Sequence, residues 1–192
     1  MSEKHVIQRV RHDVKMRILT VTRVEKLTPH MVRITVHGPE LEGFPSASPD
    51  DHVKVFLPTS SGEFNLPTMT PDGPVYTQGK EPSPARDYTP RQFRAESLEL
   101  DLDFVIHGDG PASTWAAKPT VGDKLRVRGP RGPMIVPGAF DHYVLVGHAT
   151  ASPAPRRWLP DAPQATTVTV LAAVASPDEQ QALAPHVRLF VP

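Results

Sequence analysis

The 192-residue chain contains no cysteine. This absence excludes disulfide bonds, thiolate zinc sites, cysteine-ligated iron–sulfur clusters and cysteine nucleophiles. Any redox chemistry must therefore use a bound cofactor. Excess charge is also missing, because 21 lysines and arginines balance 21 aspartates and glutamates. A neutral chain has no general electrostatic attraction to nucleic acids or membranes, so we expect any anion-binding site to be local.

Long apolar runs are absent as well. No run reaches the roughly 18–20 residues of a membrane-spanning helix. The first ten residues, MSEKHVIQRV, lack the apolar centre of a secretion signal. We therefore expect a cytoplasmic protein with neither nucleic acid nor membrane as a partner. The nine histidines are scattered without metal-ligand spacing, and no hydrolytic Ser/His/Asp order or carboxylate pair stands out. The sequence thus predicts no metal site and no catalytic side chain.

Proline, in contrast, is abundant: 23 of 192 residues, against a usual share of about 5%. Prolines interrupt helices and central strands, so many short apolar runs between prolines indicate β-structure. The clearest run is SLELDLDFVIHG, in which apolar residues occupy one face and Glu99, Asp101 and Asp103 the other. Five or six such strands separated by turn signals predict an antiparallel six-stranded barrel over residues 1–140.

After Phe140 the pattern changes. The apolar segments HYVLVG, TTVTVLAAV and VRLFV alternate with two short helical pieces, around RRWL and PDEQQALA. This alternation predicts a parallel sheet. The unit has only about fifty residues, which is marginal for an independent core. The predicted fold class is therefore β plus α/β, with the barrel followed by an incomplete parallel-sheet nucleotide-binding domain at 141–192.

The segment RDYTPR has an arginine at each end of a strand-like stretch. Arg86 and Arg91 can both fork onto phosphate oxygens. Tyr88 offers a flat ring that can stack on a planar ligand, and Thr89 a short hydroxyl. These residue types suit a phosphate-bearing ligand with an aromatic ring. The alternative is a surface strand whose arginines pair with neighbouring carboxylates.

The segment HGDGPASTWAA follows the clearest strand. Gly108 and Gly110 let the backbone approach a ligand, and Pro111 favours the first turn of a helix. Free amides there, together with Ser113, make an anion site without a lysine. The alternative is an ordinary turn with a capped helix, in which His107 is a structural hydrogen-bonding group.

A third segment, VGHATASPAPRRW, could begin a nucleotide site because a strand is followed by glycine and a run of small residues. It is not the GxGxxG pattern, and Pro153 and Pro155 disturb the following helix. A plain strand-to-helix connection is therefore the favoured interpretation.

The first two segments together resemble the ferredoxin reductase-like flavoproteins, in which R-x-Y-[ST] and a later G-x-x-S hold a flavin. Here these are Arg86–Thr89 and Gly110–Ser113. The fuller strings RDYTPRQF, DFVIHGDGPASTWA and VRGPRG resemble one branch, the siderophore-interacting proteins, which are FAD-dependent ferric-siderophore reductases. The resemblance covers about residues 15–175.

The resemblance implies FAD as cofactor and a ferric siderophore as substrate, with iron released in the cytoplasm as Fe(II), which binds hard-oxygen chelators far less well. Arg86 would meet the FAD phosphates, Tyr88 would pack on the isoalloxazine, and Thr89 would hydrogen-bond near its reactive edge. The other implied cofactor-binding residues are Arg91, His107, Gly108, Gly110, Pro111, Ala112, Ser113 and Trp115. The flavin carries the chemistry, so no protein base is required.

The chain departs from this family's pattern in its second unit. Members typically carry Gly/Ala-Asp-Glu-Thr-Ala-Leu-Pro-Ala, whereas here the string is GHATASPA, with His148 and Ala149 in place of the acidic pair. The family also continues past Pro192. We therefore assign no residue to NAD(P)H, and an external electron donor stays open. The alternatives are an FAD-binding module without hydride transfer, a truncated non-catalytic relative, and a β-barrel that binds another ligand.

Overall fold

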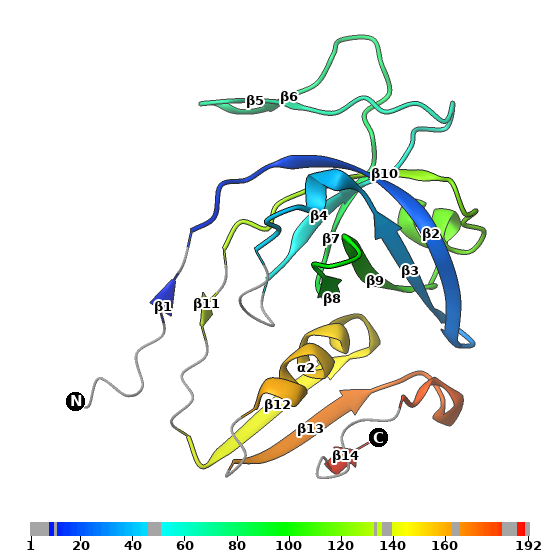
Figure 1. Cartoon of the computed structure of the whole chain (residues 1–192). Coiled ribbons are helices and arrows are strands. Elements are labelled where there is room, and N and C mark those ends of the chain that lie inside the picture. Colours follow the sequence, from blue (N-terminus) through cyan, green and yellow to red (C-terminus); the bar gives the residue numbers. More distant parts are fainter. Residues whose placement is uncertain are drawn as a thin grey trace.

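The computed structural model describes residues 8–9, 11–45, 51–132, 134–135, 140–162, 166–181 and 188–190. A curled antiparallel sheet forms the larger part, and a small parallel sheet with one short helix lies below it in Figure 1. Two small antiparallel pairs complete the sheets: β1 (Gln8–Arg9) with β11 (Met134–Ile135), and β5 (Thr68–Thr70) with β6 (Gly73–Val75).

The curled sheet has seven strands, one more than the six expected. Their order is β7 (Ala85–Tyr88), β4 (Val53–Phe56), β10 (Lys124–Arg128), β2 (Met16–Thr28), β3 (Met31–His37), β9 (Glu99–Val105) and β8 (Pro90–Arg94). The extra strand comes from RDYTPRQF, which divides at Thr89 into β7 and β8 on opposite edges of the sheet. Because a single residue joins the two edges, the sheet must curl into a half-barrel.

The half-barrel core follows the predicted alternation, but β9 (Glu99–Val105) buries both of its faces. Leu100 and Leu102 are fully buried in the core. Asp101 and Asp103 lie on the charged face that the alternation predicted. They are nevertheless also buried, at 2% and 4% exposed. Arginines from the neighbouring strands β3 and β8 cover them. Strand β9 is therefore buried on both faces, although one of these faces carries charged residues.

The second unit contains the predicted parallel sheet. Strands β12 (His142–His148), β13 (Thr167–Ala173) and β14 (Arg188–Phe190) pair in parallel. The helix α2 (Pro153–Trp158) lies between the short 3-10 helices η3 (Ala149–Ala151) and η4 (Leu159–Asp161). The expected helical piece at 177–184 is represented by the 3-10 helix η5 (Pro177–Glu179), and residues 182–184 lie outside the described residues. The domain boundary at 140 stays a prediction.

Contacts between the described residues of the two units lie at two places. Helix α2 packs on β8, where Arg157 Nη1 donates to the carbonyl of Pro90 at 3.2 Å. The carboxylate of Glu179 accepts hydrogen bonds from the hydroxyl of Thr28 and from the backbone N–H of His30 at 3.0 Å. The second unit is thus fixed to the half-barrel at two separate places. No helix in the described ranges is long and apolar enough to cross a bilayer.

Candidate functional site

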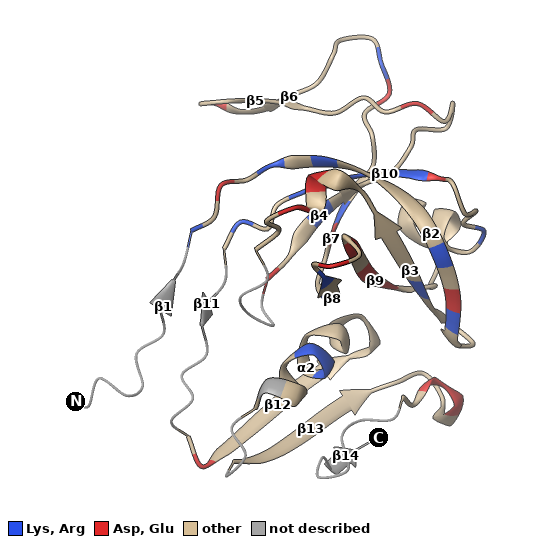
Figure 2. Cartoon of the chain, viewed as in Figure 1, with Lys and Arg blue, Asp and Glu red and all other residues tan. Residues whose placement is uncertain are grey.

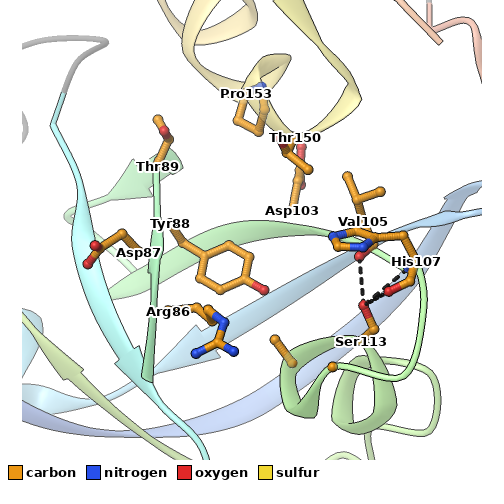
Figure 3. A pocket seen from close by; sticks show the side chains of 12 residues that line it. Arg86, Asp87, Tyr88, Thr89, Asp103, Val105, His107, Ser113, Thr150 and Pro153 are labelled. Atoms are coloured by element: carbon orange, nitrogen blue, oxygen red, sulfur yellow. Dashed lines mark hydrogen bonds between the residues drawn. The ribbon is translucent and has the colours of Figure 1, made fainter. Parts of the chain in front are cut away.

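A pocket of about 300 Å³ opens beside β7 and the start of helix α1 (Pro111–Ala116), with the second unit above it (Figure 3). It contains seven of the residues singled out from the sequence: Arg86, Tyr88, Thr89, His107, Gly110, Ala112 and Ser113. The two sequence segments that looked weak alone therefore form opposite walls of one pocket.

Strand β7 places Arg86 and Tyr88 on the same side because side chains alternate along a strand. The intervening Asp87 forms an ion pair with Lys54 Nζ at 2.7 Å. The Arg86 guanidinium is exposed, and its hydrogen bond within the described residues goes to the neighbouring Ala85 carbonyl at 2.8 Å. Among those residues no carboxylate pairs with it.

Tyr88 is held by an aromatic stack. Its ring lies 4.2 Å from that of Phe104, with an interplanar angle of 38°, and Phe104 in turn lies 5.7 Å from Trp115. Burial raises the pKa of Tyr88 to about 12, against a smaller opposing effect of the Arg86 cation. The phenol therefore stays neutral at ordinary pH and presents an uncharged ring to the pocket.

The opposite wall is organised by Ser113. Its hydroxyl donates to the carbonyl of His107 at 2.7 Å and accepts from the His107 N–H at 3.1 Å (dashed in Figure 3). The hydroxyl is thereby engaged in holding the loop. Gly108 has φ of +56°, which favours glycine.

Gly110 is different, because its φ of −67° suits any residue and an added Cβ would meet no atom within 4 Å. The protein alone does not require glycine at this position. A ligand lying close to the backbone would require it.

Four predicted residues do not line the pocket. Gly108 and Pro111 belong to the same loop and helix start, and Trp115 packs toward the core through Phe104. Arg91 lies half-buried on β8, and its Nε is buried without a hydrogen-bond partner. Burial, followed by the positive charge of Arg33, lowers the pKa of Arg91.

The pocket also includes residues that sequence reasoning did not assign to this site. Asp103 and Val105 come from β9, whose alternation marked it only as a strand. Thr150 and Pro153 come from the second unit, within the segment that was interpreted as a plain connection. Both residues lie in the string GHATASPA, but the sequence alone does not show that this string faces the pocket formed by the half-barrel. Among the described residues, no group of three or more histidines and carboxylates could hold a metal ion.

The architecture also occurs in solved structures of distant sequence. A ferredoxin reductase from a carbazole dioxygenase system superposes with a TM-score of 0.66 at 13% identity, covering 93% of this chain and 50% of that one. At this identity the likeness concerns the fold alone: a curled antiparallel sheet followed by a parallel sheet.

Family models then identify the branch. The siderophore-interacting FAD-binding domain matches residues 20–134, and the siderophore-interacting protein model matches residues 140–191. The chain belongs to the siderophore-interacting protein family and carries its FAD-binding domain, as the resemblance implied.

Individual relatives agree with the family. The chain is 44% identical over 152 residues to an NADPH-dependent ferric-chelate reductase of Escherichia coli, covering 79% of this chain and 59% of that protein. It is 39% identical over 140 residues to a ferric vibriobactin reductase of Vibrio cholerae, covering 72% and 51%. A siderophore utilization protein from T. fusca superposes with a TM-score of 0.87 at 35% identity, covering 97% and 72%. The chain thus spans a little over half the length of these two curated relatives.

Proposed function

We propose that this chain is an FAD-dependent reductase of ferric siderophores that releases iron as Fe(II) in the cytoplasm. The observation that carries the proposal is Arg86, an exposed guanidinium that has no carboxylate partner among the described residues, beside the neutral ring of Tyr88 in the pocket. The names of two relatives, a ferric-chelate reductase and a ferric vibriobactin reductase, support the substrate class. The division into a flavin-binding domain at 1–140 and a nucleotide-binding-like domain at 141–192 is part of this proposal.

Each wall has its role in the proposal. Arg86 binds phosphate oxygens, Tyr88 packs against the flavin ring, and Thr89 donates a hydrogen bond to it. Gly110 and Ala112 let the backbone approach the diphosphate, and Ser113 holds their loop in place. When bound, FAD supplies the one-electron chemistry that ferric reduction needs. His107 also lines the cofactor pocket. The remaining predicted residues, Arg91, Gly108, Pro111 and Trp115, support the site from strand β8, the loop or the core.

A second candidate is an FAD-binding module without NAD(P)H-dependent activity. One observation favours it: Val144 and Val146 on β12 are 57% and 74% exposed. Parallel sheets in nucleotide-binding domains are normally covered on both faces. Electrons would then come from an external donor and not from a dinucleotide bound to this sheet.

The test of the cofactor is the visible absorption spectrum of the purified chain, titrated with FAD. Arg86→Ala should weaken FAD binding by roughly tenfold or more, because charge-assisted hydrogen bonds contribute about 1.5–3 kcal/mol. The matched control is Arg11→Ala, which removes an exposed arginine outside the pocket. A folded chain that takes up no FAD, or equal binding by the two variants, would contradict the assignment.

A second measurement separates the two candidate functions. NADPH or NADH is added to the flavin-loaded chain without oxygen, and a ferric siderophore follows. Bleaching by the dinucleotide and reoxidation by the ferric chelate support the complete reductase. Reoxidation after chemical reduction only, without bleaching by either dinucleotide, supports the module that uses an external donor.

A further inference from the structure

Helix α2 of the second unit contacts both the pocket and strand β8. Pro153, at the start of the helix, is buried and lines the pocket. Arg157 follows four positions later, about one helical turn along, so the two side chains lie on the same side of the helix. Figure 2 shows the basic turn of α2 beneath β8, on which the helix packs. One short element of the second unit therefore lines the pocket and contacts the half-barrel.

Arg157 reaches two segments of the half-barrel at once. Its Nη1 donates to the carbonyl of Pro90 at 3.2 Å, and its Nη2 lies 3.5 Å from Asp51 Oδ2. The side chains of Arg157 and Asp51 are 11% and 0% exposed, so solvent screens their interaction weakly. A guanidinium is a rigid planar fork that holds two acceptors in a fixed relative position. Arg157 therefore fixes the Pro90 carbonyl relative to the Asp51 carboxylate.

The two acceptors belong to the segments that flank the corner at Thr89. Pro90 follows Thr89 directly and begins β8. Asp51 lies two residues before Val53, which pairs with Tyr88 on β7. Thr89 is the single residue between β7 and β8, so its backbone sets the direction in which the chain leaves β7. Its side chain lines the pocket (Figure 3). The contacts of Arg157 therefore act on the backbone that carries a pocket residue.

We propose that Arg157 is a positioning residue for the flavin. By holding the carbonyl of Pro90, it fixes the backbone at Thr89 and keeps the Thr89 hydroxyl in place to donate to the flavin ring. Arg157 acts through Thr89 and does not itself line the pocket. This inference rests on the proposed function, because it concerns the same site. It gives the second unit a role in flavin binding that is the same whether the electrons come from a dinucleotide or from an external donor.

The first test is the FAD affinity of the whole chain, measured by titration of its visible absorption. Arg157→Gln should weaken FAD binding by roughly threefold to tenfold, the usual contribution of one neutral hydrogen bond. The matched control is Arg156→Gln, which removes the neighbouring arginine of the same helix. The buried Nε and Nη1 atoms of Arg156 have no hydrogen-bond partner among the described residues, so this variant should bind FAD like the wild type. Equal losses in the two variants would contradict the proposal.

A double-mutant cycle with Thr89→Val tests whether the effect passes through Thr89. Thr89→Val removes the hydroxyl and should itself weaken FAD binding by a similar factor. Because Arg157 acts through that hydroxyl, adding Arg157→Gln to Thr89→Val should lower the affinity by less than about twofold more. Losses that multiply in the double variant would show that the two residues act independently and would overturn the proposal.

Glu179→Gln separates local positioning from general docking of the second unit. It weakens the other contact between the units, at Thr28 and His30, and none of these three residues lines the pocket. Its FAD affinity should stay within about twofold of the wild type, measured where urea unfolding shows each variant to be fully folded. If Glu179→Gln weakens FAD binding as much as Arg157→Gln, any loosening between the units is sufficient and the specific role of Arg157 is refuted.

Hydrogen–deuterium exchange of the cofactor-free chain makes the test independent of the FAD assignment. Peptides that cover residues 86–94 should exchange faster in Arg157→Gln than in the wild type, because the corner at Thr89 loses its support. Arg156→Gln and Glu179→Gln should exchange there like the wild type. Unchanged exchange in Arg157→Gln overturns the positioning role whether or not the chain binds FAD. Faster exchange in a chain that takes up no FAD supports the positioning of Thr89 and refutes the proposed function alone.

Discussion

The half-barrel and the parallel-sheet unit differ in whether both faces of a strand are buried. In the half-barrel, β9 buries leucines on one face and the carboxylates of Asp101 and Asp103, with their arginine partners, on the other. In the second unit, β12 buries Tyr143 against α2, while Val144 and Val146 on the other face are exposed. The sequence predicted alternating faces for β9 and apolar strands for the second unit. Stability should therefore be concentrated in the half-barrel.

The largest expected effect is that of Phe104→Ala in the half-barrel. Phe104 is fully buried and touches both Tyr88 and Trp115, so its truncation leaves a cavity beneath the pocket. We expect a loss of about 3–5 kcal/mol in the free energy of unfolding, measured by urea denaturation, together with weaker FAD uptake. The control is Val75→Ala, at a position 54% exposed, which should change stability by less than about 0.5 kcal/mol. Similar values for both would mean that this core relaxes around the lost ring.

The next effect concerns the charged face of β9. Asp103→Asn leaves Arg33 without its carboxylate in a pair whose side chains are 0% and 17% exposed. We expect a loss of about 3 kcal/mol, since breaking a buried ion pair costs more than the pair itself contributes. The double variant Asp103→Asn with Arg33→Met should recover part of this loss in the same urea assay. A single variant as stable as the wild type would show that solvent replaces the carboxylate.

The burial of these charged pairs could not be predicted from the sequence. Apolar patterns located the strands and predicted the parallel pairing, and Pro111 indicated the start of a helix, because these signals depend on residues that are close in the sequence. They could not show that Asp103 is buried, since the partner Arg33 lies 70 positions away. Nor could they show that the residues before and after Thr89 belong to strands at opposite edges of the sheet. As a result, Arg86 lines the pocket, whereas Arg91 lies on β8 next to helix α2. The sequence indicated which residue types belong to the site, whereas only the fold shows which of them lie close together.

The contact between the units should have a smaller effect. Glu179 is 8% exposed and accepts from Thr28 and His30. Burial favours the neutral acid, but these hydrogen bonds outweigh it and lower the pKa of Glu179 below the ordinary value of 4.5. A carboxyl with a lowered folded-state pKa stabilises the fold fully above the unfolded pKa, and this stabilisation is lost as the pH falls through the folded value.

We therefore expect Glu179→Gln to cost about 1–2 kcal/mol at pH 7 and progressively less as the pH falls below about 4.5. Urea unfolding between pH 7 and pH 3 measures this difference. Asp101, whose pKa is also lowered, titrates in both proteins and cancels in the comparison. A cost that does not depend on pH would mean that the interaction does not require the ionised carboxylate.

The smallest expected effect tests the uncovered face directly. Val146→Thr replaces a methyl by a hydroxyl at a position 74% exposed, so its hydroxyl stays in water and stability should change by less than about 0.5 kcal/mol. Val168→Thr makes the same change on the neighbouring strand at 1% exposed and should cost about 1–3 kcal/mol, because the buried hydroxyl loses its hydration. Unfolding curves of the two variants compare the sheet faces with the chemistry held constant. Equal costs would mean that Val146 is covered in solution and that the contrast between the two units is smaller than the structure indicates.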